Sequence, residues 1–127
     1  MTHRSRLCQV IVDVPPADYE RETDFWSAAL GREPHHPTNH PQYAEFGEVT
    51  PGLLFDVQSV GESTPRVHLD LETDDVEAEV ARLVALGATE LSRPHHWVVM
   101  QDPVGTVFCV VPVQLAEAFE AHATTWD

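Results

Sequence analysis

The chain has 127 residues, of which 43% are hydrophobic and 22% are charged, a composition typical of one soluble globular domain. Its 21 Asp and Glu residues against 7 Lys and Arg give a net charge of -14, which argues against nucleic acid as a partner. No apolar run approaches the ~20 residues of a membrane span, and no signal peptide is recognised, so we expect a cytoplasmic protein.

The first predicted module covers about residues 7–58 and opens with a strand. Leu7 to Val14 alternates, and its β-branched content favours a strand that ends at Pro15-Pro16. One face of this strand carries Cys8 and three valines. The other face carries Leu7, Gln9, Ile11 and Asp13.

A helix and a hairpin complete the first module. The helix is predicted over 17–30, with Asp18 as its N-cap and Gly31 as the left-handed residue that ends it. A loop rich in proline and histidine follows. Tyr43 to Gly47 and Leu53 to Val57 then have the pattern of two hairpin strands.

A polar linker, Ser59 to Pro65, separates the halves, and the second module is expected at about 66–113. It opens with an alternating strand over 67–73. A helix follows, with Asp74 as the expected N-cap, and Gly87 ends it.

Three further strands are predicted in the second module. They lie at 89–91, 97–101 and 107–111, and Asp102 to Gly105 forms a β-turn before the last, which is apolar enough to be central. In the C-terminal segment, 114–127, we expect a short helix over 115–122 followed by a frayed tail.

The two halves align, since Gln9 corresponds to His68 and Gly31 to Gly87. Each is predicted as a strand, a helix and three strands, and neither would bury its sheet alone. We therefore expect an α+β fold: a single domain over 1–127 in which two paired βαβββ modules form a half-open curved sheet, or cup, with the helices outside.

The stretches VHLDLETDDVEAEVARLVALGA and WVVMQDPVGTVFCVV resemble the glyoxalase-like domains of the vicinal oxygen chelate superfamily. This superfamily includes glyoxalase I, extradiol dioxygenases and bleomycin-resistance proteins, so the resemblance implies a fold more than an activity. Its metal-dependent members supply His, Glu, His and Glu-like ligands from four strands. The corresponding positions here are Gln9, Phe55, His68 and Cys109, a set that suits no common divalent metal. We therefore predict no metal or other cofactor, with a divalent metal as the less favoured alternative.

Strand alternation predicts which side chains face the cup: Gln9, Ile11, Asp13, His68, Asp70 and Glu72. Three carboxylates and a histidine would make it acidic, which suits a cationic ligand or acid–base chemistry. In the alternative interpretation, Asp13 and Glu72 lie at strand ends in solvent.

Two functions stay open, and the sequence does not decide whether the protein is an enzyme. The first is a binding module, similar to bleomycin-resistance proteins, for a small cationic or aromatic organic molecule. The resemblance implies that such a binding module forms a homodimer. The second is a lyase, isomerase or dehydratase of small oxygenated substrates in which His68 acts with Asp70 or Glu72, or through a divalent metal. The predicted ligand-binding residues are Gln9, Asp13, Phe55, His68, Asp70, Trp97 and Cys109.

Overall fold

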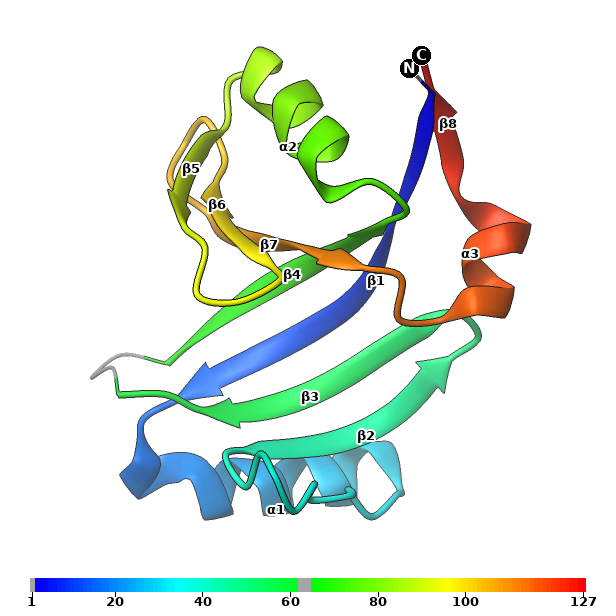
Figure 1. Ribbon diagram of the computed structural model, residues 1–127. Coiled ribbons are helices and arrows are strands. Elements are labelled where there is room, and N and C mark those ends of the chain that lie inside the picture. Colours follow the sequence, from blue (N-terminus) through cyan, green and yellow to red (C-terminus); the bar gives the residue numbers. More distant parts are fainter. Residues whose placement is uncertain (1, 62–64) are drawn as a thin grey trace. The chain divides into compact units, whose positions relative to one another are not determined.

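The computed structural model describes residues 2–61 and 65–127, and it contains eight strands and three α-helices within them (Figure 1). This confirms the predicted α+β class, and the strand order shows a sheet that is open rather than closed. The chain divides into two compact units. Unit 1 comprises Met1–Cys8 and Leu69–Asp127, and unit 2 comprises Gln9–His68. The predicted linker over 59–65 lies partly outside the described residues.

Unit 2 is built on the parallel pairing of two strands. The second half of β1 (His3–Val14) pairs with β3 (Leu53–Ser59), and β2 (Tyr43–Thr50) pairs with β3 in an antiparallel hairpin, as predicted. Only two strands follow the helix in this module within the described residues. In place of a third, His35 forms an isolated bridge with Glu45.

Helix α1 (Tyr19–Leu30) covers one face of the unit 2 sheet. A 3-10 turn, Pro16–Asp18, leads into it, and Gly31 ends it in the left-handed conformation, at φ 69°, as predicted. Asp18 occupies the N-cap position, but its side chain makes no capping bond and pairs with Arg21 instead. The core under this helix is apolar and is formed by side chains of the helix and of the sheet. Its residues are Val10, Val12, Val14, Tyr19, Trp26, Leu30, Ala44, Phe46, Val49, Phe55 and Val57.

Unit 1 is built around β7 (Val107–Pro112), which is central as predicted. It pairs in parallel with β4 (Arg66–Thr73) and antiparallel with β6 (Val98–Gln101), and β5 (Thr89–Ser92) pairs with β6. Helix α2 (Val76–Ala85) packs on one face of these strands through an apolar cluster centred on Val80, Met100 and Val110. The predicted turn is present, with the Gly105 amide donating to the Asp102 carbonyl.

Two local expectations for unit 1 are wrong. The N-cap of α2 is Asp75 rather than Asp74, because the Asp75 carboxylate accepts from the Ala78 amide while Asp74 is bound by Arg4. The C-terminal residues do not fray. After α3 (Ala116–His122), the strand β8 (Thr124–Trp126) pairs antiparallel with the first residues of β1 (Figure 1).

A buried ionic cluster joins α2 to the chain ends within unit 1. Glu79 on α2 is fully buried, and both of its carboxylate oxygens accept from Arg82, at 2.8 and 2.9 Å. His3 contacts the same carboxylate at 2.8 Å. The Arg82 guanidinium lies 3.9 Å from the centre of the Trp126 ring, which ties β8 to this cluster. Glu79 is therefore a structural carboxylate, and both of its oxygens have hydrogen-bond partners.

The pKa of Glu79 gives a stability prediction. Burial opposes its ionisation, but hydrogen bonds from Arg82, His3 and Ser5 outweigh burial and lower its pKa. A lowered pKa in the folded state stabilises the fold above the ordinary glutamate pKa, and this contribution is lost as pH falls through the folded value. We expect Glu79→Gln to reduce the free energy of unfolding at pH 7 by about 3 kcal/mol.

Urea denaturation at pH 7 and at lower pH checks this expectation. Glu79→Gln should lose less stability on acidification than the wild type, because the titrating group is absent. The matched control is Glu117→Gln on the exposed surface of α3. An unchanged pH dependence in Glu79→Gln would contradict the role given to this carboxylate.

Candidate functional site

The face of the unit 2 sheet opposite α1 carries polar side chains. In the β1–β3 register, Ile11 lies opposite Asp56 and Asp13 lies opposite Gln58. In the β2–β3 register, Glu45 lies opposite Asp56. Because paired residues share a face, these positions lie together, and His68 joins them through its contact with Asp13. We call this set the Asp13 face: Gln9, Ile11, Asp13, Tyr43, Glu45, Asp56, Gln58 and His68.

A short polar contact on this face joins Asp13 and His68. The Oδ2 atom of Asp13 lies 2.5 Å from Nδ1 of His68, and their side chains are 7% and 11% exposed. The sequence predicted both residues for the site but paired His68 with Asp70 or Glu72. No local pattern joins residues 55 positions apart, so this partner could come only from the structure.

The second oxygen of Asp13 differs from the first. Oδ1 is buried and makes no hydrogen bond within the described structure. Asp13 is 5% exposed, so the alternative interpretation that it lies in solvent at a strand end is wrong. A buried polar atom without a partner costs free energy, and such atoms in native proteins call for an explanation.

The Asp13 face has a buried floor and a partly exposed rim. Gln9, Asp13 and Asp56 are buried. Tyr43, Glu45, Gln58 and His68 are half-buried, and the Gln58 amide nitrogen donates to the Tyr43 hydroxyl at 3.1 Å. Arg66, two residues before His68 on β4, is the nearest arginine along that strand. The rim therefore combines neutral and acidic groups with the His68 imidazole, and the buried carboxylates lie beneath it.

The predicted residues Asp70, Glu72, Trp97 and Cys109 lie in unit 1. Asp70 lies opposite Cys109 in the β4–β7 register, on the face that α2 does not cover, and one of its oxygens lies within 4.8 Å of the Cys109 sulfur. Trp97 and Cys8 pack against Cys109 in an apolar cluster. Burial and the carboxylates of Glu72 and Asp70 raise the pKa of the Cys8 thiol, so this thiol stays neutral.

Glu72 has structural contacts on both of its oxygens. It is fully buried, so it does not lie in solvent. Oε2 accepts from Arg6 at 2.6 Å, and Oε1 accepts from the backbone amides of Gln114 and Leu115, at 2.6 and 3.0 Å. These bonds fasten the segment before α3 to β4. Because these structural bonds use both oxygens, we do not propose the predicted catalytic role for Glu72.

Residues 9–111 match the family model described as "Glyoxalase-like domain". This chain belongs to the glyoxalase-like domain family, within the vicinal oxygen chelate superfamily. No curated protein matches its sequence.

Solved structures agree with the glyoxalase-like fold. Methylmalonyl-CoA epimerase from Mycobacterium tuberculosis is 17% identical with a TM-score of 0.60, over 88% of this chain and 90% of that one. A structure described as NAD-dependent benzaldehyde dehydrogenase from Legionella pneumophila is 13% identical with a TM-score of 0.57. The match covers 83% of this chain and 99% of that one. A glyoxalase/bleomycin resistance protein from Albidiferax ferrireducens T118 is 18% identical with a TM-score of 0.36. The match covers 84% of this chain and 98% of that one. At such identities, the first two establish similarity of fold alone.

The metal positions of the superfamily hold a poor donor set in this glyoxalase-like chain. Phe55 packs in the core beneath α1, 5.1 Å from Trp26 and 5.9 Å from Phe46 between ring centres, so it supplies no ligand and does not line the Asp13 face. The other positions offer the Gln9 amide, the His68 imidazole and the Cys109 thiol, which do not fit a hard divalent ion. Metal analysis of untagged protein tests the predicted absence of a metal site.

Asp56, like Tyr43, Glu45 and Gln58, belongs to the Asp13 face but was not among the residues predicted from the sequence. The apolar Phe55 and Val57 point to the α1 core, so alternation along β3 sends Asp56 to the opposite face, beside Ile11 and Glu45. This signal was present in the sequence. The alternation along β3 was not used to predict Asp56, because the superfamily's ligand position was assigned to its neighbour Phe55.

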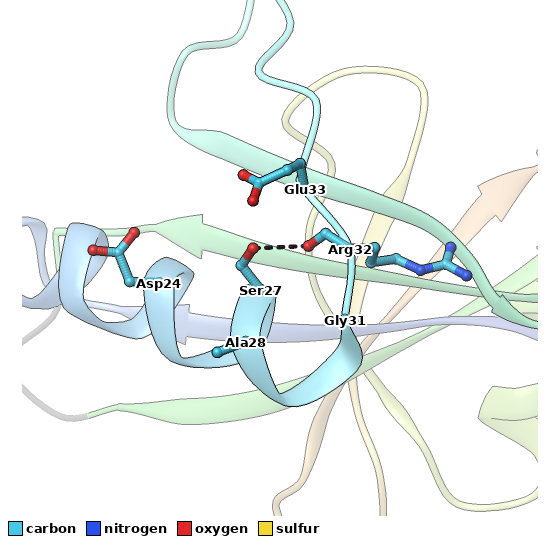
Figure 2. Close-up of a pocket in the computed structure, with 6 residues that line it drawn as sticks. All are labelled: Asp24, Ser27, Ala28, Gly31, Arg32 and Glu33. Atoms are coloured by element: carbon cyan, nitrogen blue, oxygen red, sulfur yellow. Dashed lines mark hydrogen bonds between the residues drawn. The ribbon is translucent and has the colours of Figure 1, made fainter.

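A shallow surface pocket lies at the C-terminal end of α1, apart from the predicted residues (Figure 2). The Ser27 hydroxyl donates to the Arg32 carbonyl there, and the Arg32 guanidinium donates to the carbonyls of Phe46 and Glu48. Ser27 and Arg32 are thus both bonded to backbone carbonyls, and we assign the pocket no ligand. The residues that line it are Asp24, Ser27, Ala28, Gly31, Arg32 and Glu33.

The contrast between Asp13 and Glu72 predicts a small loss of stability when Asp13 is replaced by its amide and a large loss when Glu72 is replaced by its amide. Asp13→Asn should change the free energy of unfolding by less than about 1 kcal/mol, because the weaker His68 contact is offset by removal of an incompletely bonded buried charge. Glu72→Gln should lose about 3 kcal/mol, because Arg6 is left without its counter-charge. Urea denaturation at pH 7 compares the two. Equal large losses would show that Asp13 is a structural carboxylate like Glu72.

Proposed function

We propose that this glyoxalase-like protein binds a small organic cation at the Asp13 face of unit 2. The observation that carries the proposal is the buried Asp13 carboxylate, which has one oxygen on His68 and the other without a hydrogen-bond partner. A ligand that brings positive charge and a donor would satisfy this oxygen and recover the free energy that burial costs.

The electrostatics of the face support a cation. On the neighbouring strand β3, the buried Asp56 lies two residues before Gln58, which is the residue opposite Asp13. Glu45 on β2 lies opposite Asp56. Three carboxylates on one sheet face create a negative potential that attracts cations, and the net charge of -14 acts in the same direction. Small-molecule sites commonly combine a few convergent polar groups of this kind with apolar surroundings, here Ile11.

A second candidate function is acid–base catalysis, and the 2.5 Å contact between Asp13 and His68 favours it. A carboxylate that accepts from Nδ1–H fixes the imidazole ring and stabilises its protonated form. Any proton exchanged with a substrate would then pass through Nε2 of His68. In this case Asp13 is the partner of His68, in place of Asp70 or Glu72, and the substrate would be a small oxygenated molecule. Homodimer formation and a cytoplasmic location stay predictions for either function.

None of the helices within the described residues has the length and apolar character to cross a membrane.

Titration calorimetry with a panel of small cations tests the proposed binding. Putrescine, benzylamine and arginine amide are suitable probes, with benzoate as the anionic comparison. We expect saturable binding of at least one cation and none of benzoate. Asp13→Asn should weaken that binding roughly tenfold or more, the effect of a lost charge-assisted hydrogen bond.

Glu117→Gln is the matched control, because it removes one negative charge at an exposed position of unit 1. It should leave the affinity unchanged. If Asp13→Asn and Glu117→Gln weaken binding equally, the cations respond to net charge rather than to this face. If none of the cations binds, the proposed function is wrong.

A further inference from the structure

We infer that the group received by Asp13 is an N–H donor, a primary ammonium or guanidinium, rather than a quaternary ammonium. This inference rests on the proposed function and narrows its ligand class. It follows from the bonding state of one oxygen and from the distribution of aromatic side chains in unit 2.

The two oxygens of the Asp13 carboxylate differ in their hydrogen bonding. Oδ1 is buried without a hydrogen-bond partner, whereas Oδ2 accepts from His68. A quaternary ammonium carries positive charge but no N–H group, so it would leave Oδ1 without a bond. A primary ammonium has three donors and a guanidinium has five, and either would complete the carboxylate with a charge-assisted hydrogen bond.

The aromatic rings of unit 2 lie mainly on the side of the sheet away from Asp13. Quaternary cations are bound by cages of aromatic rings that surround the methyl groups. In unit 2, Trp26, Phe46 and Phe55 lie in the core beneath α1, on the other side of the sheet. The Asp13 face offers the rings of Tyr43 and His68, each with a polar contact, to Gln58 and to Asp13 respectively. Its described residues therefore hold no aromatic cage.

Access to Oδ1 of Asp13 favours a compact donor. Oδ1 is shielded from solvent, and Gln58 lies opposite Asp13 in the β1–β3 register. Gln58 is half-buried, so its flexible side chain can move aside from its contact with the Tyr43 hydroxyl. A compact ammonium needs little displacement and can donate to the Gln58 carbonyl as well as to Asp13. A trimethylammonium group needs more room and can donate to neither.

Benzylamine and benzyltrimethylammonium form a matched pair of probes for this inference. They share the ring and the positive charge and differ in the N–H groups. Titration calorimetry on the wild-type protein should show benzylamine binding at least roughly tenfold more tightly. Asp13→Asn should reduce this preference to less than threefold, while Glu117→Gln should retain it. The comparison on the wild type requires no variant to fold, and circular dichroism verifies the variants.

Each other outcome has a defined meaning. Equal affinity for the two probes, or tighter binding of benzyltrimethylammonium, overturns this inference and leaves cation binding standing. A benzylamine preference that persists in Asp13→Asn also overturns it, because the N–H donor would then be received elsewhere. If neither probe binds, and putrescine and arginine amide also fail, both the inference and the proposed function are wrong.

Discussion

A carboxylate removed from water must be bonded on both of its oxygens, and this requirement organises much of the structure. In unit 1, Glu79 and Glu72 meet it in full. Glu79 takes Arg82 and His3, and Glu72 takes Arg6 together with two backbone amides. These bonds hold α2, the start of β1 and the segment before α3 in place. Asp13 meets the requirement on one oxygen only, which separates it from the structural carboxylates.

The same contrast is the basis for proposing a site on one face of unit 2. Strand β1 directs Val10, Val12 and Val14 into the core beneath α1, so the alternate residues must lie on the uncovered face. Apolar packing therefore fixes the position of Asp13 without satisfying it. The superfamily uses such positions for metal ligands in many of its members, but Phe55 and the neutral Gln9 do not supply them here.

Sequence patterns predicted what depends on local periodicity and turn chemistry. The two faces of β1, the left-handed Gly31 and the hairpin of β2 and β3 all follow from neighbouring residues. What the patterns missed depends on contacts between distant parts of the chain. The tail forms β8 because His3 to Ser5 offer it an edge, and Glu72 is structural because Arg6 and the segment before α3 reach it. For the same reason, the pairing of Asp13 with His68 could not be deduced from either strand alone.

The most direct test is the side-chain carboxyl ¹³C resonance of Asp13, recorded in protein labelled at the aspartate carboxyl carbons while benzylamine is added. The account predicts a saturable shift of the Asp13 resonance that exceeds the shift of an exposed aspartate such as Asp24. If Asp13 does not move, or moves no more than Asp24, the unbonded oxygen is not where the ligand binds and the central claim is wrong.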